Sequence, residues 1–171
     1  IDVVDKNTRR PVDDLTQDDF TVLEDKAPQA IHSFDPPAFH AMPNRGQAIV
    51  HSAIDLPKIG NAPVTILVLD ELNTTSGDMS FSRQALVKYL QAQPAVLPQP
   101  TTLLIANNTH FTQVRDYTQD RDQLLADVKH HIPDIPWKLN GGLTGPGAVE
   151  RMAQTLASLE QIAQASSGTP G

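Results

Sequence analysis

The stretch that most constrains the fold is an apolar run at residues 64–69, which reads VTILVL and stops at Asp70. An uncharged run of mostly branched side chains is typical of a strand that is buried on both faces. The polar residues ELNTTS follow at once, and a helix pattern begins just after them. Strand, polar loop and helix form the start of a βαβ unit, and open α/β sheets bind ligands at such loops. The sequence therefore predicts an α/β domain with a candidate site that begins at Asp70.

The rest of residues 63–171 continues this pattern. A helix is expected over residues 79–93, and Pro94 ends it before a proline-rich connector at 94–100. A second buried strand at 101–106 leads to Asn107, and the alternating residues 111–116 suit an antiparallel edge strand. Asp120 is placed to cap a helix that runs to about residue 131, and a last helix is expected over 147–166. Its predicted buried face carries six apolar side chains: Val149, Met152, Ala153, Leu156, Leu159 and Ala163.

Two further segments precede this domain. Residues 1–34 alternate as short strands do and contain a turn signal at 7–11 and a capped turn that begins at Thr16, so they form a small β-rich segment. Residues 35–62 carry four prolines and sustain no period, which predicts an extended linker anchored by Ile49, Val50, Ile54 and Leu56. The parallel sheet would need another strand after the last helix, so we expect a chain truncated at its C-terminus.

Composition and missing motifs narrow the functional classes. A net charge of −7 disfavours nucleic-acid binding and anionic membranes, and the short basic cluster around Arg9 suits a solvated turn. The absence of cysteine excludes disulfides, thiolate zinc sites and a cysteine nucleophile. No apolar stretch has the length of about 20 residues that a transmembrane helix needs. No nucleophile elbow, Walker loop or dinucleotide fingerprint appears, so we expect no enzyme.

Several segments, taken in order, resemble a known family. VTILVLDELNTT followed by FSRQALVKYLQ is similar to the von Willebrand factor type A (VWFA) domain, and more narrowly to the VWFA-related family expanded in Acidobacteria. VVDKNTRRPVDDLTQDDFTVLEDKAPQAIHSF resembles the β-rich segment that precedes the domain in that family. QVRDYTQDRDQLLADV and LASLEQIAQASSGTPG resemble its second and last helices. The resemblance implies a doubly wound, mostly parallel, Rossmann-like sheet in an exported protein of the periplasm, cell envelope or extracellular space.

The resemblance also implies a metal-ion-dependent adhesion site at the carboxyl ends of the strands. In the family, an Asp-x-Ser-x-Ser loop and a threonine from a second loop hold a hard cation, usually Mg²⁺, with oxygen ligands. Aligned here, Asp70 and Thr74 occupy the first and last loop positions, and Thr144 stands for the second-loop threonine. Leu72 replaces the middle serine. Asn73, Asn107 and His110 would share the ligand-binding face.

These residues leave three functional hypotheses open. The first is a non-enzymatic module that binds a protein partner, with Mg²⁺ or Ca²⁺ at the degenerate site. The second is a metal-free structural or assembly module of the envelope, in which Asp70 accepts hydrogen bonds from loop amides or caps the next helix. The third is a hydrolase that uses Asp70 and His110. His130 and His131 are interpreted as helix-end residues that favour the dipole.

Overall fold

The computed structural model describes residues 3–107, 111–133 and 146–167. The chain divides into two compact units, Ile1–Ala41 (unit 1) and Met42–Gly171 (unit 2). The predicted linker at 35–62 therefore contains the boundary between them. In unit 2 no described helix is both long and apolar enough to span a bilayer, and the same holds for the described part of unit 1.

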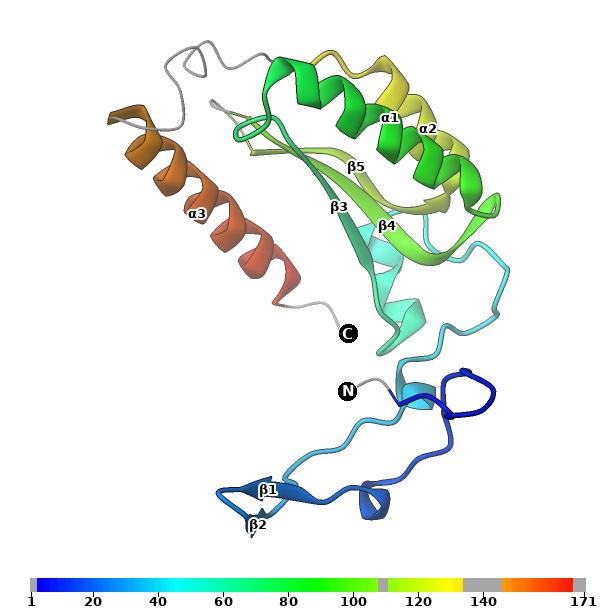
Figure 1. The fold of residues 1–171 in the computed structure, drawn as a ribbon. Helices are drawn as coiled ribbons and strands as arrows, with labels where there is room; N and C mark the ends of the chain where they lie inside the picture. Colours follow the sequence, from blue (N-terminus) through cyan, green and yellow to red (C-terminus); the bar gives the residue numbers. More distant parts are fainter. Residues whose placement is uncertain (1–2, 108–110, 134–145, 168–171) are drawn as a thin grey trace. The chain divides into compact units, whose positions relative to one another are not determined.

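Unit 1 is built from turns and one hairpin (Figure 1). Strands β1 (Val22–Glu24) and β2 (Ala27–Gln29) pair antiparallel. Their connection uses Asp25 and Lys26 at φ 51° and 69°, the left-handed backbone that a tight hairpin turn needs. The capped turn that begins at Thr16 is confirmed as the 3₁₀ helix η1 (Gln17–Asp19). The Thr16 backbone N–H and Oγ1 both donate to Asp19 Oδ2, at 2.7 and 2.9 Å.

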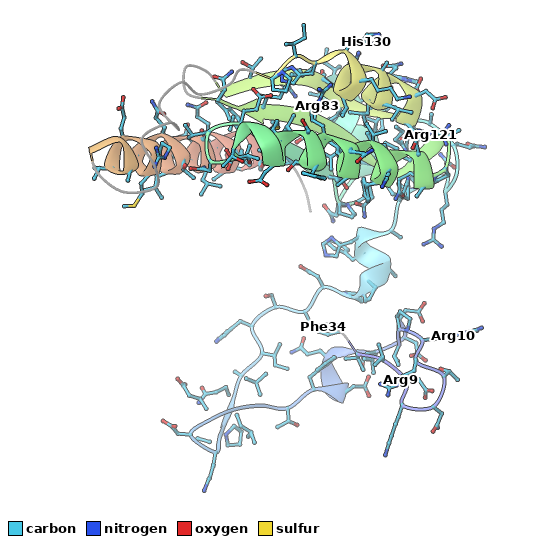
Figure 2. The ribbon with its side chains drawn as sticks, turned by 45° about the horizontal axis from the view of Figure 1, so that its top comes forward. Arg9, Arg10, Phe34, Arg83, Arg121 and His130 are labelled. Atoms are coloured by element: carbon cyan, nitrogen blue, oxygen red, sulfur yellow. The ribbon has the colours of Figure 1, made fainter. Side chains whose placement is uncertain are left out.

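The basic cluster of unit 1 lies on a turn, as expected. Arg9 N donates to Asp5 O at 2.9 Å, and Asp5 N donates to Arg10 O at 2.9 Å. Both arginine side chains are exposed (Figure 2). A second 3₁₀ helix, η2 (Pro37–His40), closes the unit.

The predicted strand at 64–70 is confirmed as β3 (Thr65–Asp70). It pairs in parallel with β4 (Val96–Ala106), in a register that places Thr65 opposite Thr101 and Asp70 opposite Ala106. Strand β5 (Phe111–Asp120) pairs antiparallel with β4, as predicted for the alternating segment. The strand order is β3-β4-β5, so β3 lies at the edge of the sheet (Figure 1).

The predicted doubly wound, mostly parallel, Rossmann-like sheet is wrong. The described residues form an α+β structure with a two-stranded antiparallel sheet in unit 1 and a three-stranded mixed sheet in unit 2. Among the described strands β3 has one hydrogen-bonded neighbour, and its Val68 side chain is 43% exposed. The physical reason is that an apolar run can form a strand with one face covered by helices as readily as a strand with both faces covered. Composition therefore did not determine how many strands flank β3.

Two helices cover one face of the three-stranded sheet (Figure 1). Helix α1 (Ser76–Ala92) begins after Thr75, whose Oγ1 accepts from Asp78 N, and α2 (Arg121–His130) begins after the predicted cap Asp120. Their shared core with the sheet is fully or nearly fully buried and consists of Leu90, Leu97, Leu103, Leu124 and Val128. Arg83 Nη2 on α1 donates to Val128 O at 2.8 Å and so joins the end of α2 to α1 (Figure 2).

Residues 49–62 are packed into unit 2. The 3₁₀ helix η3 (Ala53–Ile59) places Leu56 and Ile59 in a cluster with Val50, Ala62 and Tyr117. Of the four predicted anchors, Val50 and Leu56 are 0% and 7% exposed, whereas Ile54 is 87% exposed. Asp116 Oδ1 and Oδ2 both lie 3.1 Å from Ala53 N, which ties η3 to β5.

Burial of Tyr117 gives a pH prediction for this cluster. Desolvation, and then the charge of Asp116, raise the pKa of Tyr117 above its usual value. The neutral Tyr117 side chain therefore contributes its full stabilisation to the fold at pH values below its unfolded-state pKa of about 10. This contribution is lost as the pH rises through the higher pKa of the folded state. In a Tyr89→Phe chain, which keeps Tyr117 alone, we expect tyrosinate absorbance to appear at a higher pH in buffer than in concentrated urea. Equal midpoints in the two solvents would contradict this.

Helix α3 (Pro146–Ser166) confirms the last predicted helix. Its predicted buried face is not buried, because the large apolar side chains of that face are 56–72% exposed: Val149, Met152, Leu156 and Leu159.

Candidate binding site at the carboxyl end of strand β3

The site begins where β3 stops pairing with β4. Ala106 O accepts from both Glu71 N, at 2.8 Å, and Leu72 N, at 3.1 Å. A single carbonyl that serves two successive N–H groups ends the regular ladder, because the next residue has no partner left on β4. The chain therefore leaves the sheet directly after Asp70.

Asp70 uses its carboxylate to build the loop that follows. Oδ1 accepts from Leu72 N at 3.0 Å and from Asn73 N at 2.9 Å, and Oδ2 accepts from Asn73 Nδ2 at 2.9 Å. The bond from Asn73 N satisfies a backbone donor beyond the end of the strand, and Leu72 N is shared between Asp70 Oδ1 and Ala106 O. This geometry agrees with the second hypothesis, in which Asp70 accepts hydrogen bonds from loop amides.

This arrangement does not fit the implied adhesion-type metal site. Three N–H donors point at the two oxygens of the Asp70 carboxylate. A cation bound to these oxygens from the same directions would be repelled by the partial positive charges of the donor hydrogens. Leu72, in place of the middle serine, is 1% exposed and offers no oxygen ligand. Within residues 3–107, 111–133 and 146–167, no group of three or more His, Asp or Glu side chains is placed to hold a metal ion.

Asn73 connects the loop to helix α3. Its Nδ2 donates one hydrogen to Asp70 Oδ2 and the other to Thr155 Oγ1, at 2.9 Å each. Thr155 Oγ1 in turn donates to Arg151 O at 2.9 Å. Both hydrogens of the Asn73 amide are thus used, although the residue itself is exposed. Asn73 was predicted as part of a ligand-binding face, and the structure places it in a loop–helix link.

A buried acid–imidazole pair lies next to this loop and was missed. Glu71 is 0% exposed, and its Oε1 lies 2.5 Å from Nε2 of His131, the first residue after α2. His130, by contrast, contacts Ala126 O of its own helix at 2.8 Å, as a helix-end residue would. The predicted helix-end role therefore describes the contacts of His130, whereas His131 also contacts a residue far away in the chain.

The strand period could have found Glu71. Side chains two residues apart share a face, so Leu67, Leu69 and Glu71 point to the same side of the sheet. Leu67 and Leu69 pack in the clusters beneath α1 and α2. A glutamate that continues this face is predicted to be buried, and a buried carboxylate requires a donor. The identity of that donor, 60 residues away in the chain, has no local signal.

The structure brings some of the predicted site residues together. Asp70, Asn73 and Thr74 share the loop, and the half-buried Asn107 follows Ala106, the register partner of Asp70. Thr144 and His110 lie outside the described residues, so their predicted roles are not addressed.

Two cavities lie away from this site. One of about 400 Å³ belongs to unit 1 and is lined mainly by apolar side chains such as Leu15, Phe20 and Phe34. The other, of about 430 Å³, lies on unit 2 between the sheet and the last turns of α3, with Ile66, Leu104 and Ile162 among its lining. Neither lining contains Asp70, Glu71, Asn73 or His131.

No protein-family model, curated protein or solved structure matches this chain. The resemblance to the VWFA-related family therefore stays a prediction.

Proposed function

We propose that this protein is a non-enzymatic interaction module of the bacterial cell envelope, whose contact surface is the loop after β3 and which needs no bound cation. The observation that carries the proposal is the set of three hydrogen bonds accepted by the Asp70 carboxylate. They give Asp70 a structural role that is complete within the protein. The envelope location rests on the family resemblance.

The loop has the properties of a preformed contact surface. Its start is held by Asp70, and its end is held by Thr75, whose Oγ1 lies 2.7 Å from Asp78 Oδ2 and 3.3 Å from Asp78 N. Asn73 and Thr75 are exposed between these points. A loop fixed at both ends loses little conformational entropy when a partner binds, which favours recognition by polar contacts.

A catalytic role has less support from the same residues. Glu71, the carboxylate next to Asp70 in the chain, is fully buried, and a general base must reach the proton that it abstracts. The polar groups of the site are bonded to one another.

Substitutions at Asp70 separate a structural carboxylate from a metal ligand. We expect Asp70→Ala to lower the free energy of unfolding by about 1–2 kcal/mol, because Asn73 N and one hydrogen of the Asn73 amide lose their acceptor and Leu72 N loses one of its two acceptors. Asp70→Asn keeps a side-chain oxygen that can accept from Leu72 N and Asn73 N, so we expect about half that loss or less. Urea unfolding followed by circular dichroism measures both.

The matched measurement is a titration with Mg²⁺ and Ca²⁺. We expect no binding heat and no change in melting temperature for the wild-type chain or for either variant. A cation that raised the melting temperature of the wild-type chain, but not that of Asp70→Asn, would contradict the metal-free proposal, because ligand binding to the native state must stabilise it.

A retention experiment tests the contact surface itself. The immobilised chain is exposed to an envelope extract of its source organism, in Mg²⁺ and in excess chelator. We expect the same protein to be retained in both, and lost on Asn73→Arg but not on Thr21→Arg, an exposed position in unit 1. Retention only in Mg²⁺, or equal retention by both variants, would contradict the proposal.

A further inference from the structure

Helix α3 is oriented with its apolar side toward solvent. The side chains that are buried or half-buried on α3 are largely polar or small and include Arg151, Thr155 and Ser158, with Arg151 only 7% exposed. The adjoining side carries Val149, Met152, Leu156, Leu159 and Ala163, which we call the α3 stripe. Its four large side chains are 72%, 65%, 57% and 56% exposed. A contiguous exposed apolar surface of this kind marks an association site.

The spacing of the α3 stripe is that of a helix–helix seam. Successive members are three, four, three and four residues apart, which is the a/d pattern of a heptad repeat. At a rise of about 1.5 Å per residue the seam is about 21 Å long. Two positions per heptad form a narrower face than a helix uses to cover a sheet, and such a seam fits one other helix.

We propose that the α3 stripe binds a second copy of this chain, with the two α3 helices packed antiparallel about a two-fold axis. The flanks of the stripe favour this occupant. Ala153 and Thr155 are uncharged, and Glu160 is the one charged flanking residue. In an antiparallel pair Glu160 lies opposite Ala153 of the second copy, so that two identical helices meet without like-charge repulsion.

Side-chain volume selects the antiparallel arrangement. Antiparallel packing places the large Met152 opposite the small Ala163 of the second copy, and Leu156 opposite Leu159, so the layers are filled more evenly than in a parallel pair. Parallel packing would place Ala163 on Ala163 and Met152 on Met152, which leaves one layer underfilled and another crowded. The opposed helix dipoles also favour the antiparallel pair.

A membrane surface is the weaker alternative for the same stripe. Helices that lie on anionic membranes carry Lys or Arg along their polar face. The only cation of α3, Arg151, is buried, and its exposed charges are Glu150 and Glu160. These exposed acidic side chains would be repelled by anionic lipid headgroups.

The expected affinity is modest. A stable protein interface buries about 800 Å² per partner, and a single seam of this length supplies only part of that area. We therefore expect dimers with a dissociation constant of tens of micromolar, on the order of −6 kcal/mol. This inference uses a surface other than the loop after β3, so its failure would leave the proposed function untouched.

Sedimentation velocity of the full chain over about 1 to 500 μM is the test, because this range brackets the expected dissociation constant. We expect the wild-type chain to shift from monomer to dimer, Leu156→Lys to stay monomeric, and Ala157→Lys to dimerise as the wild type does. The control adds the same charge at the adjacent exposed position. A wild-type chain that stays monomeric throughout, or equal dimerisation of both variants, would overturn the proposal.

The absence of cysteine allows a second test that does not depend on a charged substitution. Chains carrying Leu156→Cys and Leu159→Cys are mixed and oxidised. We expect the mixed disulfide to form in preference to either homodimer. Preferred Leu156→Cys homodimers would overturn the antiparallel arrangement. Binding of the wild-type chain to phosphatidylglycerol vesicles without dimerisation would assign the stripe to a membrane and overturn the proposal as a whole.

Discussion

Replacing His131 by alanine is expected to lower the free energy of unfolding of unit 2 by about 2–3 kcal/mol, because it removes an imidazole from a fully buried carboxylate. Glu71 Oε1 and His131 Nε2 are 2.5 Å apart, and Glu71 is 0% exposed. The His131 side chain is 20% exposed. Because water reaches this side chain, we expect a smaller loss of stability than for an ion pair with both members fully buried. Urea unfolding at 222 nm measures the effect, since the described α-helices all belong to unit 2.

His130→Ala is the matched control for this prediction. His130 is adjacent to His131 in the sequence and is exposed. Among the described residues, the one hydrogen bond of its ring is to Ala126 O, a carbonyl of its own helix. We expect a loss of at most about 0.5 kcal/mol. Equal losses in the two variants would mean that the His131 effect reflects the end of α2 and not the contact with Glu71.

Neutralising the carboxylate gives the decisive comparison. If the cost of His131→Ala comes from a buried charge, then Glu71→Gln in the His131→Ala background should recover part of the loss, since burying an amide costs less than burying a carboxylate. In the wild-type background the same Glu71→Gln change should be destabilising. Additive effects of the two substitutions would contradict a direct interaction between these side chains.

The Glu71–His131 contact also shows what a single sequence can convey. Elements with a strong local signal were predicted: the apolar run of β3, the cap at Asp120 before α2, and the capped turn at Thr16. Each depends on residues that are close together in the chain. The contact between Glu71 and His131 depends on how α2 packs on the sheet, and a residue pair 60 positions apart leaves no mark in local periodicity.

The proline-rich segment at 94–100 illustrates a second limit. Three prolines in the seven residues 94–100 predicted a connector, but Val96–Ala106 forms one strand that contains two of them, Pro98 and Pro100. Proline removes a ladder donor, and the register between β4 and β5 shifts between Val96 and Thr101, where both prolines lie. An irregular register can therefore accommodate residues that local rules exclude from a strand.

Asp70 marks the corresponding limit for the site. An aspartate at the end of a strand can hold a cation or its own loop, and both roles draw on the same oxygen-rich sequence. The choice depends on where Leu72 N and Asn73 N point, which is a property of the backbone after the strand ends. The sequence therefore points to a candidate site at this loop but does not determine its chemistry.

The second large effect is expected at Gln119, which is 2% exposed and holds residues 49–50 against the sheet. Its Oε1 accepts from Ile49 N at 3.0 Å and Val50 N at 3.2 Å, and its Nε2 donates to Leu97 O at 3.0 Å. Gln119→Ala removes all three bonds at a site that excludes water. We expect a loss of about 3 kcal/mol, since each unsatisfied buried group costs about 1–3 kcal/mol and the chain relaxes in part.

The same substitution should release the segment that contains η3 before the rest of unit 2 unfolds. Lys58 lies in this segment and is a trypsin site, so its cleavage rate measures how often residues 49–62 detach from β5. We expect faster cleavage after Lys58 in Gln119→Ala. Gln113→Ala is the control, because Gln113 is an exposed glutamine of the same strand with one bond, to Thr102 Oγ1 at 3.0 Å. Unchanged cleavage in Gln119→Ala would show that the apolar cluster around Leu56, and not the buried amide, holds this segment in place.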